Sequence, residues 1–213
     1  MVLLRDRAEA GAAVARLVEP LLDGEDALVL GVPRGGVIVG RAVADVLSLD
    51  LDVVVVRKLG VPGHEEFGFG AIGEDGVKVL DYATLAMLGL SEETIDAVEA
   101  SERIELGRRV LAYRDGKEAA SIAGRTIVLV DDGIATGGTM RAAIEVCRAR
   151  GAARVIVGVG VAPPDVLESL GDEADAAVAA LIPAPMEAVG QWYLDFRQTT
   201  DEEVAAALSG AGA

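Results

Sequence analysis

The sequence contains one cysteine and one histidine in 213 residues. A single thiol, Cys147, cannot form a disulfide within the chain, which favours a reducing compartment such as the cytoplasm. One histidine and one cysteine are also too few for the ligand sets that zinc usually takes. We therefore expect Cys147 to be a small buried residue of a helix and His64 to lie on the surface, and neither to act as a catalytic group.

Long apolar runs and positive charge are scarce as well. No apolar run reaches the roughly 18 residues that a membrane-spanning helix needs, and residues 1–7 lack the pattern of a signal peptide. The 19 basic residues are outnumbered by 35 acidic ones, for a net charge of −16. Such a surface repels phosphate backbones and anionic membranes, so we expect neither nucleic acid nor membrane as a partner. An anionic ligand would need a locally basic site or a divalent metal.

Nearly continuous apolar runs alternate with helical patterns along the chain. This alternation predicts an α/β fold of three layers, with a mostly parallel five-stranded sheet and helices on both faces. We expect one domain over 1–213, with its core at about 25–182 and a small cap (hood) at about 183–213. The expected strands are 27–32, 52–57, 126–131, 154–161 and 176–182. The expected helices are 5–19 (ending near Pro20), 36–47, 91–114, 138–150, 164–170 and one that begins with a capping box at Thr200.

Residues 58–80 interrupt the alternation. They are rich in glycine and contain only short strand-like pieces, at 69–73 and 77–80. Within them, residues 68–73 match the pattern G-x-G-x-x-G of dinucleotide-binding turns. That turn must lead into a helix, whereas residues 74–76 (Glu-Asp-Gly) are typical of a tight turn. We therefore exclude a dinucleotide-binding function for this segment.

The most informative segment is 127–139, with the sequence IVLVDDGIATGGT. An apolar strand ends in two acids, Asp131 and Asp132, and a loop of small residues leads into a helix. Free backbone N–H groups and the helix dipole make such a loop a binding site for anions. A ligand with a phosphate beside hydroxyl groups, such as ribose 5-phosphate, fits both features. An ordinary strand-to-helix turn with a solvated acid pair is the alternative.

This segment resembles the phosphoribosyl-pyrophosphate (PRPP) motif of the type I phosphoribosyltransferases, except that Gly133 stands where a branched apolar residue is usual. The resemblance covers roughly residues 25–196. It implies that Asp131 and Asp132 contact the ribose hydroxyls as catalytic residues, that Mg²⁺ bridges PRPP oxygens with these acids as its candidate protein ligands, and that the 5-phosphate is bound by Ala135, Thr136, Gly137, Gly138 and Thr139.

The resemblance extends to two further segments. Arg34, Gly35 and Gly36 match the pyrophosphate loop, in which a strained peptide often exposes an amide. Arg57 and Lys58 match a basic pair of the adenine-type members, with Arg57 binding pyrophosphate and Lys58 in a catalytic role. In those members a flexible loop follows the pair and closes over the reacting centre, which implies such a loop at 59–76. The alternatives are an ordinary turn and a solvated basic pair.

Aromatic residues make up only 3% of the chain, and three of them lie near its C-terminus. Residues 182–196 loosely resemble the base-binding hood of the hypoxanthine-guanine phosphoribosyltransferases, with Met186 roughly where the stacking aromatic would be. Trp192 and Tyr193 are adjacent, so in an extended segment they point to opposite sides. We expect Trp192 to pack inward and Tyr193 to face the ligand, with Asp195 accepting a hydrogen bond from the base. Simple packing of the cap is the alternative.

The resulting hypothesis is a Mg²⁺-dependent transferase of nucleotide salvage, which joins a nucleobase or related nitrogen nucleophile to PRPP and releases pyrophosphate. Two other interpretations stay open. One is a regulatory protein that binds PRPP or a nucleotide without transferring anything, and the other is a hydrolase in which water replaces the base. The sequence specifies neither the acceptor nor the oligomeric state, and a homodimer is one option.

Overall fold

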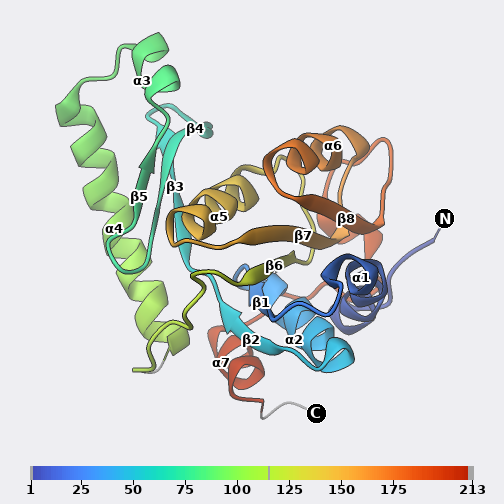
Figure 1. The fold of residues 1–213 in the computed structure, drawn as a ribbon. Helices are drawn as coiled ribbons and strands as arrows, with labels where there is room; N and C mark the ends of the chain where they lie inside the picture. Colours follow the sequence, from blue (N-terminus) through green and yellow to red (C-terminus); the bar gives the residue numbers. More distant parts are fainter. Residues whose placement is uncertain (1, 115, 211–213) are drawn as a thin grey trace.

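The computed structural model describes residues 2–114 and 116–210, whose centre is a five-stranded sheet (Figure 1). The strand order is β2-β1-β6-β7-β8, and all neighbours are parallel. This confirms the predicted three-layer α/β fold. The strands are β1 (Ala27–Gly31), β2 (Asp50–Val53), β6 (Thr126–Asp131), β7 (Arg154–Val161) and β8 (Ala176–Leu181).

Two helices cover each face of the sheet (Figure 1). Helices α1 (Arg7–Leu22) and α2 (Gly35–Leu47) pack on one face, and α5 (Gly138–Ala149) and α6 (Pro164–Glu173) lie on the other. Cys147, a residue of α5, is fully buried, as expected, and burial raises the pKa of its thiol to about 12. None of the helices in the described part of the chain is both long and apolar enough to cross a membrane.

Helix α1 does not end near Pro20, as the sequence predicted, but continues to Leu22. A proline inside a helix removes one backbone hydrogen bond. Here it lies in the last turn, and Leu22, only 7% exposed, packs into the core beyond it. Burial of this leucine favours the additional turn.

The predicted strand 52–57 is also wrong, because the chain changes sheets within it. Strand β2 ends at Val53, and β3 (Val56–Val61) belongs to a second, antiparallel sheet with the order β3-β4-β5. Its other strands are β4 (His64–Gly73) and β5 (Lys78–Leu80). Helices α3 (Tyr82–Leu88) and α4 (Glu92–Arg114) follow, and α4 packs along this sheet (Figure 1).

Most of the predicted flexible loop, 59–76, is therefore regular structure. It forms the β3–β4 hairpin, in which Leu59, Phe69 and Ile72 are fully buried. The G-x-G-x-x-G sequence lies inside β4, which agrees with its exclusion as a nucleotide-binding turn. His64 is exposed at the start of this strand. Closure of the hairpin turn over a ligand stays a prediction.

A buried ion network joins the two sheets where the chain crosses between them. Arg114, at the end of α4, binds both carboxylate oxygens of Glu74, and its Nη1 lies 3.0 Å from Oδ1 of Asp52. It also donates to the carbonyl of Val53 at 3.0 Å, while Glu74 accepts from the amide of Val55 at 3.4 Å. The side chains of Arg114 and Glu74 thus provide hydrogen-bond partners for the carbonyl of Val53 and the amide of Val55, where the chain leaves the first sheet. This explains why one apolar run divides into two strands.

The C-terminal segment crosses back to the start of the chain. After a short 3-10 helix at Val189–Trp192, the backbone pairs with residues near the N-terminus. The amide of Leu4 donates to Trp192 at 2.9 Å, and the amide of Leu194 donates to Leu4 at 2.8 Å. Helix α7 (Asp201–Ser209) follows, and its predicted capping box between Thr200 and Glu203 is confirmed.

Candidate functional site

The acid pair lies at the carboxyl end of β6, directly against the loop that follows β1. A Cβ atom on Gly35 would lie 1.9 Å from Oδ2 of Asp132, and one on Gly36 would lie 2.5 Å from the carbonyl oxygen of Val130. Both contacts are far inside van der Waals distance. Residues 35 and 36 therefore have to be glycine for the two predicted ligand-binding loops to pack together in this way.

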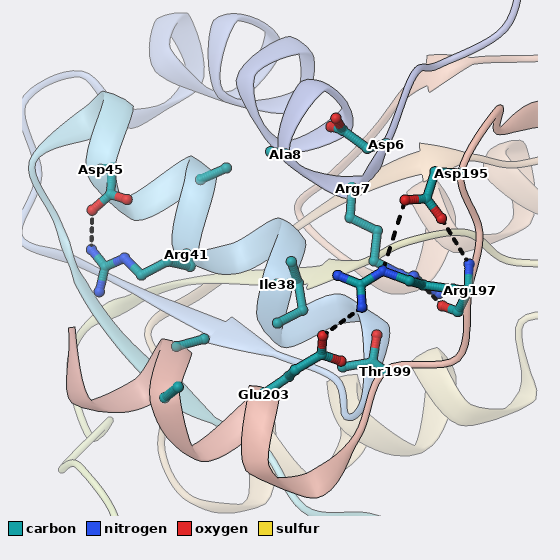
Figure 2. A pocket seen from close by; sticks show the side chains of 13 residues that line it. Asp6, Arg7, Ala8, Ile38, Arg41, Asp45, Asp195, Arg197, Thr199 and Glu203 are labelled. Atoms are coloured by element: carbon teal, nitrogen blue, oxygen red, sulfur yellow. Dashed lines mark hydrogen bonds and ion pairs between the residues drawn. The ribbon is translucent and has the colours of Figure 1, made fainter. Parts of the chain in front are cut away.

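Arg7 is a site residue that the sequence analysis missed. Its Nε donates to Oδ2 of Asp132 at 2.8 Å, and the two side chains are only 11% and 14% exposed. The same guanidinium donates to the carbonyl of Arg197 at 2.8 Å (Figure 2). It also lies 4.2 Å from the ring centre of Phe196. Nothing local in the sequence marks this arginine, because its partner lies 125 positions away.

The two acids differ in their surroundings. Asp132 has Arg7 as its ion-pair partner, whereas Asp131 accepts a hydrogen bond from the amide of Asp132 at 2.8 Å. Burial, followed by the neighbouring charge of Asp132, raises the pKa of Asp131 well above its ordinary value. A cation bound beside Asp131 would reverse this shift, because it would favour the ionised carboxylate.

The predicted phosphate loop lines a cavity of about 640 Å³ together with the basic pair. Gly137, with a φ of +84°, turns the chain into α5, which begins at Gly138. A Cβ on Gly138 would lie 3.2 Å from Nζ of Lys58, so this ammonium group reaches the loop. The cavity brings together residues of the loop after β1, strand β3, helix α4 and the loop before α5, including Pro33, Arg57, Lys58, Glu102, Thr136, Gly138 and Thr139.

The basic pair does not close a parallel strand, as the sequence suggested, but begins β3 of the antiparallel sheet. Even so, Arg57 and Lys58 both line the cavity. The Arg57 guanidinium forms an ion pair with Glu102 of α4 at 2.5 Å. A phosphate that reaches Arg57 would therefore compete with a carboxylate.

Arg34 is not among the residues that line this cavity. Its Nη1 lies 3.8 Å from Oδ1 of Asp201 at the start of α7, and the side chain is 37% exposed. The peptide between Pro33 and Arg34 is cis. For Arg34 to bind pyrophosphate as predicted, its side chain would have to leave Asp201.

The expected orientation of the two C-terminal aromatics is reversed. Tyr193 is the buried one, 6% exposed, and its hydroxyl donates to the carbonyl of Asp132 at 2.5 Å. Trp192 is only half-buried. The Tyr193 hydroxyl fits against Gly160, where a Cβ would lie 2.0 Å from it. The Tyr193 side chain therefore packs against the backbone of the acid pair, and the expectation that it faces a ligand is wrong.

The Asp195 side chain does not share the buried position of the Tyr193 side chain. Its side chain is 60% exposed and lies 3.8 Å from Nε of Arg197. It lines a different cavity, of about 500 Å³, between α1, α2 and α7 (Figure 2). Arg7 also lines this cavity, but residues 135–139 do not. A base-binding role for Asp195 stays a prediction that the position of this cavity does not favour.

The departure at Gly133 has a structural reason. A Cβ there would lie 2.5 Å from Cγ1 of Val189 and 2.7 Å from Cγ1 of Val161. A side chain from the cap thus occupies the space that a branched residue would fill. The Val189 side chain thus packs against Gly133 and connects the loop to the C-terminal segment.

Comparison with known proteins agrees with this geometry. The family model of the phosphoribosyl transferase domain matches residues 4–170, so the chain belongs to that family. "Putative phosphoribosyl transferase Rv0571c" of Mycobacterium tuberculosis (strain ATCC 25618 / H37Rv) is 46% identical over 211 residues, which are 99% of this chain and 47% of that protein. The chain thus spans about half the length of the curated relatives it matches.

A solved structure shares the whole fold. The crystal structure of TT1426 from Thermus thermophilus is 44% identical to this chain, with a TM-score of 0.90 over 98% of each chain. The resemblance inferred from residues 127–139 is therefore confirmed at the level of the family and the fold.

Proposed function

We propose that the protein transfers the phosphoribosyl group of PRPP to a nucleobase or related nitrogen nucleophile and releases pyrophosphate. The observation that carries this proposal is the shared cavity, in which the loop before α5 lies opposite Lys58 and Pro33 of the loop that follows β1. A protein with a net charge of −16 needs a locally basic site to bind an anion. Arg57 and Lys58 provide positive charge in this cavity.

The residues that line the cavity and those in the loops beside it would each bind one part of PRPP. Backbone N–H groups of 135–139 and the hydroxyls of Thr136 and Thr139 would bind the 5-phosphate at the N-terminus of α5. Lys58 and Arg57 would bind the pyrophosphate, with Arg34, Gly35 and Gly36 from the loop after β1. Asp131 and Asp132 would contact the ribose hydroxyls and stabilise positive charge as the bond to pyrophosphate breaks.

The acid pair also fits a magnesium ion. Mg²⁺ prefers oxygen ligands and is commonly held by one or two carboxylates together with substrate phosphates. Asp131 is buried beside a second carboxylate, and the described residues contain no cluster of three or more metal-ligating side chains that could hold the ion alone. Asp131 and Asp132 would therefore hold Mg²⁺ jointly with PRPP, and the ion would neutralise negative charge on the pyrophosphate.

The first test is binding and turnover. PRPP with Mg²⁺ should raise the melting temperature by mass action, and ribose 5-phosphate should do so more weakly because it lacks the pyrophosphate. A screen of nucleobases should then identify one that releases pyrophosphate. Pyrophosphate release without any base would indicate a hydrolase, and binding without release would indicate a regulatory protein. No thermal shift at millimolar PRPP, with calorimetry also silent, would contradict the proposal.

The loop residue Thr139 offers a narrower test. Thr139→Val removes one hydroxyl that would bind a charged phosphate, so PRPP affinity should fall by about 1.5–3 kcal/mol, or roughly 10- to 150-fold. Isothermal titration calorimetry measures this change. Thr84→Val on α3, at a residue that does not line the cavity, is the matched control and should leave affinity unchanged. Equal affinity of the Thr139 variant and the wild type would remove this residue from the phosphate site.

A further inference from the structure

Helix α4 forms one wall of the cavity that the proposed function assigns to PRPP. The residues of α4 that line it are Val98, Ser101, Glu102 and Arg109. Positions 98, 102 and 109 are four and seven residues apart, which is the spacing of one helix face. Figure 1 shows α4 alongside β3, the strand that carries the basic pair. A ligand that fills the cavity therefore contacts α4 as well as the two loops.

The α4 wall contributes one acid and one base to this cavity. The carboxylate of Glu102 lies 2.5 Å from Nε of Arg57, so it partly neutralises the charge that Arg57 offers to an anion. Arg109 is the third cation of the lining, beside Arg57 and Lys58. Its surroundings decide whether its charge is available to a ligand.

The guanidinium of Arg109 is held at one end only. Its Nε donates to Oε1 of Glu105, one turn earlier, at 2.8 Å, and within the described chain its two Nη groups donate no hydrogen bond. Hydrogen bonds from Arg108 and then from Arg109 lower the pKa of Glu105 to about 2, so this carboxylate stays charged near neutral pH. Glu105 thus fixes Nε and leaves the planar pair of Nη groups to bind two oxygens of one phosphate.

This turn of α4 lies near the loop that follows β1. Asp201, at the start of α7, stands between them, because Nη1 of Arg34 and Nη1 of Arg108 each lie 3.8 Å from one of its carboxylate oxygens. Pro33 of the same loop lines the cavity together with Arg109. The proposed function gives this loop the pyrophosphate and gives the loop before α5 the 5-phosphate. Arg109 therefore lies on the pyrophosphate side of the cavity.

We propose that Arg109 binds the pyrophosphate of PRPP and that Glu105 positions it for this contact. The inference rests on the proposed function and adds a residue of α4 to that site. Both Nη groups of Arg109 donate to oxygens of one phosphate. As the bond between ribose C1 and the pyrophosphate oxygen breaks, the electron pair stays on that oxygen, and a guanidinium already in place stabilises the added negative charge.

Ligand affinity tests the role of Arg109. Arg109→Gln should weaken binding of PRPP and of inorganic pyrophosphate, each with Mg²⁺, by roughly 10- to 150-fold, because a hydrogen bond to a charged group is lost. Ribose 5-phosphate lacks the pyrophosphate, and its affinity should change by less than about twofold. Arg103→Gln is the matched control, since Arg103 pairs with Glu99 in the same i,i+4 geometry but does not line the cavity. Isothermal titration calorimetry measures these affinities.

The outcomes separate this inference from the proposed function. A wild type that transfers phosphoribosyl groups while Arg109→Gln keeps full affinity for pyrophosphate would overturn the inference alone. An equal loss of affinity for ribose 5-phosphate would also overturn it, as would a wild type that binds no pyrophosphate. Binding of pyrophosphate that depends on Arg109, in a wild type that transfers nothing, would support the inference and contradict the proposed function.

Two substitutions of Glu105 test its positioning role. Glu105→Ala and Glu105→Gln both lose the charge, but only the amide oxygen of glutamine can still accept from Nε of Arg109. The alanine variant should therefore bind pyrophosphate roughly 2- to 10-fold more weakly than the glutamine variant, which is the cost of ordering one free side chain. The difference should vanish when Arg109→Gln is added, because Glu105 acts through the guanidinium. Equal affinities, or a difference that persists without Arg109, would overturn this role, and circular dichroism checks that each variant is folded.

Discussion

Asp131→Asn should reduce turnover by at least about 100-fold and, at the same time, make the ligand-free protein more stable at neutral pH. Turnover falls because the amide cannot supply the negative charge that the proposed transition state needs. Stability rises because the wild-type carboxyl is buried beside Asp132 without its own cation. The amide keeps the shape of the side chain and can still accept the hydrogen bond from residue 132.

The stabilisation should depend on pH in one direction. The pKa of Asp131 is raised in the folded protein, so folding favours the protonated form. The wild type therefore loses stability as pH rises from the unfolded pKa of about 3.9 towards the folded one. The asparagine does not titrate. The difference in melting temperature between variant and wild type should thus grow as the pH rises above about 4 and level off above the raised pKa of Asp131.

Asp132→Asn is the matched control, because it alters the neighbouring acid with the opposite consequence for stability. It removes the ion-pair partner of Arg7, whose side chain is 11% exposed, and should lower the melting temperature. Thermal scans across pH together with a pyrophosphate-release assay measure both properties. A pH-independent difference for Asp131→Asn, or a loss of stability, would contradict the assigned surroundings of Asp131.

Arg114→Met should destabilise the fold by about 3–5 kcal/mol, because it breaks a buried ion network from one side. The methionine fills much of the space but leaves Glu74 and Asp52 without their cation, and the Glu74 side chain is only 5% exposed. For a domain of this size the melting temperature should fall by about 10 °C. Urea denaturation monitored by circular dichroism gives the free energy of unfolding.

An exposed arginine on another helix provides the comparison. Arg148 forms an ion pair with Asp175 but is 38% exposed, so Arg148→Met should cost less than about 1 kcal/mol. Adding Glu74→Gln to Arg114→Met should restore part of the loss, because no uncompensated charge then remains at that position. Similar effects of the two arginine substitutions would show that the buried network does not join the sheets as described.

The sequence predicted strands β1, β6, β7 and β8 of the parallel sheet because each is an apolar run between turn signals, and it predicted the turn from β6 into α5 because that signal is local. It could not divide residues 53–56, four valines in succession, between two sheets. The division depends on Glu74 and Arg114, which lie far along the chain. Likewise, the alternation of side chains along an extended segment correctly predicted that only one of Trp192 and Tyr193 is fully buried. Which of the two is buried depends on the space beside Gly160, which the sequence does not show.

The contacts of Arg7 impose an order on how the protein is completed during synthesis. Arg7 leaves the ribosome before Arg197, whose carbonyl it binds from 190 positions away. Contacts of such separation form late and slowly. A nascent chain that has emerged only to β8 can already build the parallel sheet and the loop before α5. Its acid pair, however, would still lack the tyrosine beneath it and the C-terminal segment that holds its arginine in place.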